Sequence, residues 1–275
     1  GCFLASLNNF SDMGQRYLNK AEVQEEAQKK NMNANLMNSF TQPLSFFDAD
    51  NAIIQVSADF ETMGEILNAN STACRLLSYI SAELIGRNIS LIIPSPFNEN
   101  HDEYMKKLHE TGNYAIVDQQ NLVLYFADKN SFIFEARLLV KVVPNDGHPP
   151  FLSAIIKPTY SNYEVILMNS DWIITGISKT CAELFDYSNN KNSEQKIVNL
   201  IPTFEELKTK MKEDSGANIN HENDRYSLSL NLKLSEINIG EHTANLVKIT
   251  VQEKKDKGAV GFDMGGNNYT KEDTE

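Results

Sequence analysis

Regularly alternating leucines mark the clearest strand of this sequence. In RYSLSLNLKLSEI, Ser, Asn and Lys separate the apolar positions Leu228, Leu230, Leu232 and Leu234. Side chains point to the two faces of a strand in turn, so this pattern indicates one buried face and one face in water. The segment TANLVKITVQ follows and is predicted to be the neighbouring strand.

The first half of the chain carries shorter apolar runs that predict a sheet with helices beside it. AIIQVSAD and EILNAN are expected strands around a loop that contains Gly64. A short helix follows, capped by Asn70 or Ser71. Its apolar face is formed by Ala73, Leu76, Leu77 and Ile80. A second helix is predicted after Pro96, and three strands at Asn121–Phe126, Phe132–Val143 and Phe151–Pro158.

The order of elements is repeated in the second half with a shift of 108 residues. The matching pairs are Thr72 with Thr180, Leu76 with Leu184, Tyr79 with Tyr187, Ile89 with Ile197, Ile93 with Ile201, and Pro94 with Pro202. No gap is needed, so the sequence predicts two copies of one small α+β domain. The expected organisation is a helical connector at 1–43, a first domain at 44–159, a divergent second domain at 160–254 and a flexible tail at 255–275.

The connector allows two interpretations. Phe10, Met13 and Tyr17 have helical spacing, and Pro43 ends the segment. The helix either packs on its own domain or enters as a signal helix from an upstream domain. The chain begins with Gly, from which we expect it to be a piece of a longer polypeptide.

Composition narrows the classes of function. The net charge of −12 and the lack of a basic stripe argue against nucleic acid as a partner. Three widely spaced cysteines fit neither a disulfide framework nor a metal motif, and they favour a reducing, cytoplasmic setting. The sequence contains no run of 18 apolar residues, so it predicts no membrane span. Phosphate-loop, nucleophile-elbow and zinc-protease motifs are also absent from the sequence, so we expect no enzyme activity.

Four segments of the first domain together resemble a PAS domain. They are NANSTACRLLSY, AELIGRNISLIIPSPF, HDEYMKKLHETG and ARLLVKVVPNDGHPPFLSAIIKP. The second domain resembles the family more weakly. The resemblance implies two PAS domains, each a five-stranded antiparallel sheet with short helices on one face. RYLNKAEVQEEAQKKN, followed by these segments, is further similar to the tiny macrocysts family, multi-spanning membrane proteins of protists with PAS domains on the cytosolic side.

The resemblance also implies which ligand chemistry to test. Flavin photochemistry of the light-sensing type needs a reactive cysteine directly after GRN, and Ile89 occupies that position. Haem is the other candidate, because His101 matches the proximal histidine of oxygen-sensing PAS kinases. Met105 lies one helical turn further, while Asn121 aligns near the Arg that stabilises oxygen there. The alternative is that His101 only packs at the start of its helix.

Two further residues of the second domain are candidates for ligand binding. For each, the sequence favours a purely structural role. His221 lies among acids and amides in NINHENDRY, which predicts a solvated loop rather than a metal site. Trp172 is expected to pack rather than to stack on a ligand.

The function expected from all of this is a regulatory or scaffold module without catalysis. Its partners would be other proteins, neighbouring domains of the same polypeptide, or a second PAS domain in a dimer or assembly. One alternative is a sensor that holds haem or a small apolar molecule in the first domain. Another is the regulatory part of a protein whose cyclase or kinase domain lies outside this chain. The cytoplasm, the cytosolic face of a membrane and a large assembly are the locations that this interpretation allows.

Overall fold

The computed structural model describes residues 44–256, except 47, 49, 112–115, 121, 146–147, 189–193 and 240–241, and except the side chains of 108, 109, 111, 148 and 239. The predicted connector helix at 1–43, most of the predicted tail and the site candidate Asn121 therefore lie outside the described residues.

The first domain is built on one antiparallel sheet with strand order β2-β1-β5-β4-β3. Its strands are β1 (Ala52–Ser57), β2 (Ile66–Ala69), β3 (Leu122–Ala127), β4 (Ile133–Asn145) and β5 (His148–Pro158). Between β2 and β3 the chain forms α2 (Ser71–Leu77), α3 (Ser81–Leu84), the 3₁₀ helix η1 (Ile89–Ile92) and α4 (His101–Thr111). The three strands that the sequence predicted for the second half of this domain correspond to β3, β4 and β5. Their predicted ends are correct to within a few residues.

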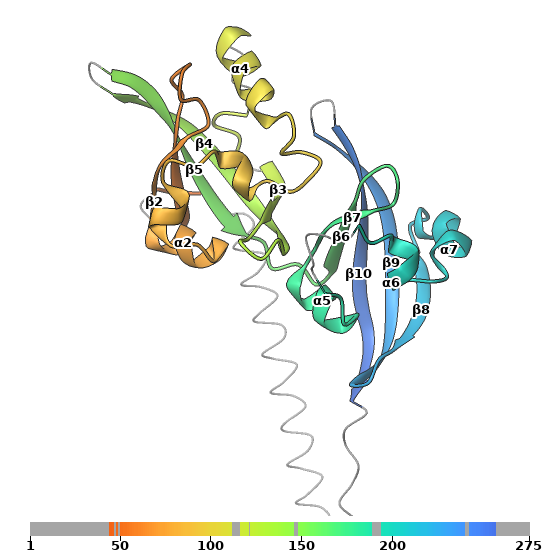
Figure 1. Ribbon diagram of the computed structural model, residues 1–275. Helices are drawn as coiled ribbons and strands as arrows, with labels where there is room; N and C mark the ends of the chain where they lie inside the picture. The colour runs from red at the N-terminus through yellow and green to blue at the C-terminus, as the bar shows by residue number, and fades with distance from the viewer. Residues whose placement is uncertain are drawn as a thin grey trace, which may run out of the picture.

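The second domain repeats this topology with strand order β7-β6-β10-β9-β8. Its strands are β6 (Glu164–Met168), β7 (Ile174–Ile177), β8 (Ala217–Glu222), β9 (Tyr226–Ile239) and β10 (His242–Asp256). Its helices are α5 (Lys179–Leu184), α6 (Ile197–Leu200) and α7 (Phe204–Met211). The predicted α+β fold class, two five-stranded antiparallel sheets with short helices, is confirmed (Figure 1).

Backbone contacts keep the 108-residue shift of the sequence repeat. An isolated antiparallel bridge joins Glu65 to Asn88 in the first domain, and the equivalent bridge joins Ile173 to Lys196 in the second. Gly64 has a φ of 85°, and its equivalent Trp172 keeps the left-handed conformation with a φ of 62°. A bulky side chain rarely adopts this conformation. At Trp172 the turn that the fold requires therefore outweighs the backbone preference of tryptophan.

The helix α2 shows how the first domain deviates from its sequence pattern. Asn70 is its cap, because its side-chain oxygen accepts a hydrogen bond from the backbone N–H of Ala73. The helix ends at Leu77, and Ser78 in left-handed conformation closes it. The prediction that Ile80 continues the apolar face is wrong, since Ile80 lies beyond the helix end and is 65% exposed.

Each domain buries its own core between sheet and helices. In the second domain the four alternating leucines of β9 are buried, which confirms the pattern prediction. They pack with Phe204 of α7, which is fully buried. The equivalent space of the first domain is filled by a cluster that includes Ile54, Ile66, Leu77 and Ile92.

One predicted loop of the second domain is a strand. The stretch around His221, expected to be solvated, forms β8 and pairs with β9 from Ala217 to Glu222. Its polar residues gave no strand pattern, but β8 is the edge of the sheet, and an edge strand tolerates polar side chains on its exposed face. Trp172 packs against Phe204 at 5.4 Å between ring centroids, which confirms its expected packing role.

The two domains lie side by side and share a third apolar cluster. Phe97, Tyr125 and Ile133 of the first domain meet Val165, Leu167, Ala244 and Leu246 of the second. These residues of β6 and β10 alternate with those of the second domain's own core, so they belong to the opposite face of its sheet. In Figure 1, α6 and α7 cover the other side of this sheet, away from the first domain. We call the seven residues the junction cluster.

None of the helices in the described part of the chain is both long enough and apolar enough to cross a membrane.

Candidate functional site

His101 is placed at the first position of α4, where its ring is partly buried. The ring atom Nδ1 is buried and has no hydrogen-bond partner among the described residues. Burial lowers the pKa of His101, and the nearby Asp102 carboxylate opposes that shift in part. The neutral form of the imidazole is therefore favoured near neutral pH, and its buried Nδ1 has no partner among the described residues.

The core of the first domain, where the family resemblance places a ligand, is filled by its own side chains. Met105, one turn along α4, is buried within the apolar cluster of the first domain. Ile54 and Ile66 of the sheet and Ile92 of η1 belong to the same cluster and are fully buried. A macrocycle placed there would have to displace several of these side chains. The structure thus brings His101 and Met105 onto one helix, while Asn121 lies outside the described residues.

The thiol groups of the described residues sit in positions that suit packing. Cys181 is fully buried in the core of the second domain, and burial raises the pKa of its thiol, with the Glu164 carboxylate adding to the effect. Cys74 of the first domain packs partly buried against its core. Ile89, at the position where flavin photochemistry needs a cysteine, is also packed against that core.

A half-buried carboxylate ties the two domains together beside the junction cluster. Glu135 of β4 accepts hydrogen bonds from four hydroxyl groups, those of Tyr125 (3.0 Å), Thr159 (2.7 Å), Ser161 (3.1 Å) and Tyr163 (2.7 Å). Thr159 and Ser161 lie in the link between β5 and β6. Lys248 of β10 in turn donates to the hydroxyl of Tyr163 at 3.0 Å. We call these six residues the Glu135 network.

Hydrogen-bond partners stabilise the charged form of Glu135. Burial alone would raise the pKa of its carboxyl group, but the hydrogen bonds from Thr159, Tyr163 and Tyr125 outweigh this, and the Lys248 charge adds to them. The net result is a lowered pKa. The same arrangement raises the pKa of Tyr125, through burial first and the neighbouring Glu135 charge second. Tyr125 therefore stays protonated and remains a donor to the carboxylate.

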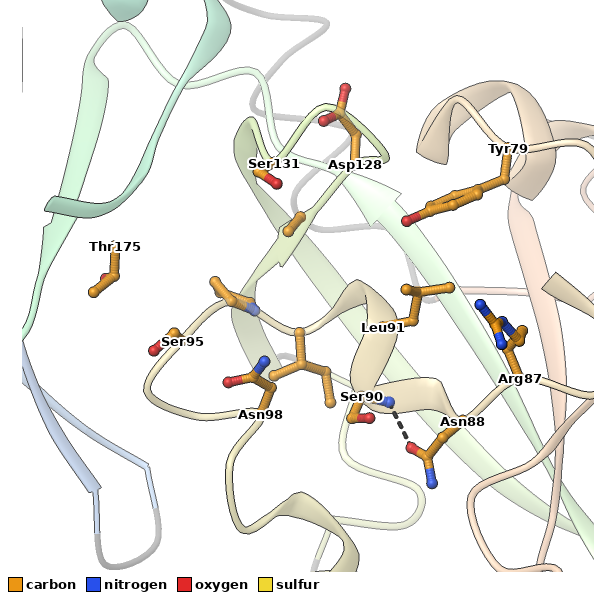
Figure 2. A pocket seen from close by; sticks show the side chains of 13 residues that line it. Tyr79, Arg87, Asn88, Ser90, Leu91, Ser95, Asn98, Asp128, Ser131 and Thr175 are labelled. Carbon is orange, nitrogen blue, oxygen red and sulfur yellow. Dashed lines mark hydrogen bonds between the residues drawn. The ribbon is translucent and has the colours of Figure 1, made fainter. Parts of the chain in front are cut away.

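A pocket of about 510 Å³ opens at the same junction (Figure 2). The first domain contributes most of its lining, from Tyr79, from residues 87–98 around η1 and from the turn between β3 and β4. The second domain contributes Thr175 of β7. Figure 2 shows Thr175 facing Ser95 and Asn98 across the pocket, with Arg87 and Tyr79 at the opposite end. This pocket lies outside the core of the first domain, where the family resemblance placed its ligand.

Sequence reasoning missed the residues of this junction. Glu135, Tyr163 and Lys248 are far apart in the chain, and single charged or aromatic residues in strands give no local signal. Phe97 was visible in the segment SPFNEN, but nothing in that segment says which surface it meets. Only the packing of one domain on the other brings these side chains together.

Comparison with known proteins supports the family assigned to the first domain. Residues 50–157 match the family model described as PAS domain. The prediction of a PAS domain is thereby confirmed for that part of the chain. The finer similarity to the tiny macrocysts family stays a prediction.

Among curated proteins, a probable serine/threonine-protein kinase of Dictyostelium discoideum is 28% identical to this chain over 145 residues. The alignment covers 52% of this chain and 10% of that protein. The chain thus spans about a tenth of the length of this relative.

Similar solved structures include two isolated PAS domains. One, from a Desulfitobacterium hafniense protein, is 20% identical and covers 40% of this chain and 92% of its own, with a TM-score of 0.32. The other, from an HTR-like protein of Haloarcula marismortui, is 16% identical and covers 48% of this chain and 98% of its own, with a TM-score of 0.32.

Proposed function

We propose that this chain is a regulatory module without catalysis, in which two PAS domains move as one body and pass a signal to neighbouring domains or protein partners. The observation that carries the proposal is the junction. Its apolar cluster and the Glu135 network join β3 and β4, the interdomain link, β6 and β10 into one packed unit. A change in one domain must therefore strain or displace the other, because packed interiors transmit small shifts.

A kinase relative supports placing the module in a longer signalling protein. The matched part is about a tenth of that relative, whose name describes it as a probable serine/threonine-protein kinase. We propose that this chain is likewise the regulatory part of a longer polypeptide, and that its effector is a covalently linked domain. The free thiols of Cys74 and Cys181 support a reducing compartment, so we place the module in the cytoplasm or on the cytosolic side of a membrane.

The acidic character of the chain supports protein partners over nucleic acid. Its net charge is −12, and phosphate backbones are bound through clustered positive side chains. A second PAS domain, in a dimer or assembly, is one such partner.

Differential scanning calorimetry tests the rigid coupling directly. The intact chain should unfold in one cooperative transition, because neither domain can unfold without exposing the junction cluster. Leu246→Asp places a charge in that cluster and should split the transition into two, whereas Val251→Asp, at an exposed position of the same strand, should leave it single.

A second variant guards against a simple folding failure. Ile133→Asp disrupts the junction from the first domain, and its far-ultraviolet circular dichroism should match that of the intact chain. Two independent transitions in the unaltered chain, unmoved by either variant, would contradict the proposal.

A further inference from the structure

We propose that the junction pocket binds a neutral, hydroxyl-rich small molecule of nucleoside or monosaccharide size, and that this ligand stabilises the docked arrangement of the two domains. The inference rests on the proposed function, since a ligand at the junction matters only if the junction transmits the signal. The pocket volume of about 510 Å³ lies within the range of about 300–1,000 Å³ typical of small-molecule sites.

Two buried polar atoms at the pocket lack protein partners. Among the described residues, Oδ1 of Asn98 and Oγ1 of Thr175 are buried side-chain atoms without a hydrogen-bond partner. Both residues line the pocket, one from each domain. Buried polar groups are paired in the great majority of cases, because leaving one unpaired costs free energy. Both atoms are closed off from solvent in the ligand-free structure, so each side chain has to rotate toward the pocket before it accepts a hydrogen bond from a hydroxyl group of the ligand.

The charges of the lining favour a neutral ligand. Arg87 and Asp128 are its only ionised residues, and their charges cancel. The Asp128 carboxylate already accepts hydrogen bonds from the backbone N–H groups of Asn130 and Phe132, both at 2.9 Å, which fixes it in the turn between β3 and β4. A ligand with a net charge would lose its hydration without gaining a full counter-charge.

The remaining lining suits a molecule with both hydroxyl groups and an apolar face. Hydroxyl groups come from Tyr79, Ser90, Ser95, Ser131 and Thr175, and the amides from Asn88 and Asn98. Leu91, Ile93, Pro94 and Ala127 give an apolar part between them. Sugars and nucleosides share this combination of donors with a flat or weakly polar face.

The position of Thr175 links the ligand to domain docking. Its neighbour Gly176 lies so close to Ile133 of the junction cluster that an added Cβ would be 2.5 Å from Cγ2 of that residue. A ligand held between Asn98 and Thr175 therefore bridges the two domains next to a close contact between them. Because it binds the docked arrangement and not the separated one, it shifts the population toward docking.

The test uses the whole chain with adenosine and glucose as probes. Each is titrated by isothermal calorimetry and by thermal unfolding, and we expect at least one to bind with a Kd of about 1 mM or tighter and to raise the unfolding temperature. Adenosine alone would identify a nucleoside site, and glucose alone a sugar site. Absence of binding by both probes would overturn the inference.

Thr175→Val is the decisive variant, because it replaces an unpaired hydroxyl by a methyl group of equal size. The ligand-free variant should unfold at the same temperature or higher, while its affinity for the probe falls about three- to tenfold. Thr180→Val, at an exposed position on α5, is the matched control and should bind as the unaltered chain does. Unchanged affinity in Thr175→Val would place the binding elsewhere and overturn the site.

The two proposals fail in different ways. A chain that unfolds in one transition but binds neither probe keeps the rigid coupling and loses only the ligand site. A chain that binds adenosine but unfolds as two independent domains loses the coupling, and then the ligand cannot act through it.

Discussion

The two domains share a fold and a repeat register, and they differ most in the connection that follows their common Ile–Pro pair. In the second domain α7 begins two residues after Pro202, and Phe204 turns directly into its own core. In the first domain α4 begins seven residues after Pro94, and Phe97 in the longer connection packs into the junction cluster instead. The same longer connection supplies Ser95 and Asn98 to the pocket. Extra chain at one point of a repeated fold has thus become a docking element.

The sheets differ in a complementary way. The second domain presents an apolar outer face, formed by β6 and β10, to its neighbour. The outer face of the first sheet is instead covered in part by its own chain, because Leu44 packs against Leu139 and Ile155. The second domain therefore supplies the docking face, while the first supplies the residues that fill it.

The largest expected effect is the difference in stability between alanine substitutions at Phe204 and at Phe97. Phe204→Ala removes a fully buried ring and should destabilise the second domain by about 3–5 kcal/mol. Phe97→Ala should cost less in the stability of either domain and should mainly loosen the junction, so that one unfolding transition becomes two. Calorimetry of both variants measures the contrast. Equal losses of unfolding free energy without any splitting would show that Phe97 is an ordinary core residue.

Gly176→Ala tests a close contact between the domains. The new Cβ would clash with Ile133, a β-branched side chain that cannot swing away easily, and overpacking of this kind costs about 1–3 kcal/mol. Asn68→Ala, at the equivalent exposed position of β2, should be close to neutral. Ile133→Ala combined with Gly176→Ala should recover part of the loss in chemical denaturation, because the two changes meet at one contact. Strict additivity would place the strain elsewhere.

Sequence patterns predicted the domains better than the surface between them. The leucines of β9 and the cap at Asn70 follow from local periodicity and capping, and both were predictable. The edge strand β8 was not, because only Ala217 and Ile219 among its residues are apolar. Glu135, Thr175 and Phe97 acquire their roles at the junction through residues of the other domain, and no local pattern encodes such contacts.

The Glu135 network should make the junction sensitive to acid. The pKa of Glu135 is lowered on folding, so the unfolded chain binds the proton more tightly. The stabilisation is then complete above the carboxyl's unfolded value of about 4.3 and is lost as the pH falls through the lowered folded value. Glu135→Gln should lower the free energy of unfolding by about 1–3 kcal/mol at neutral pH. It should also weaken the fall of stability at acid pH, which we call the acid limb.

Urea unfolding between neutral pH and the acid limb measures that difference. Glu61→Gln, at an exposed carboxyl group of the first domain, is the control and should keep the acid limb of the unaltered chain. The same acid limb in Glu135→Gln would assign it to other carboxyl groups.

The smallest expected effects come from a partly buried histidine in each domain. His101 and His221 each have one buried ring nitrogen without a hydrogen-bond partner among the described residues, and burial lowers the pKa of both. A lowered folded pKa means that the unfolded chain binds protons more tightly, so stability falls as the pH drops below the unfolded value of about 6.5. His221 also packs on Phe185 at 4.5 Å, whereas His101 lies 6.5 Å from the ring of Tyr104.

His101→Gln and His221→Gln should each remove part of the stability change between pH 7.5 and 5.5, and the double variant should remove most of it. We expect each part to be smaller than the effect of Glu135→Gln, because only one ring nitrogen of each histidine is buried without a partner among the described residues. Urea unfolding at both pH values measures it, with His242→Gln as the control. His242 is a half-exposed histidine whose Nε2 lies 3.1 Å from Nδ2 of Asn100. If the control removed as much of the pH dependence as His101→Gln does, burial would not be its cause.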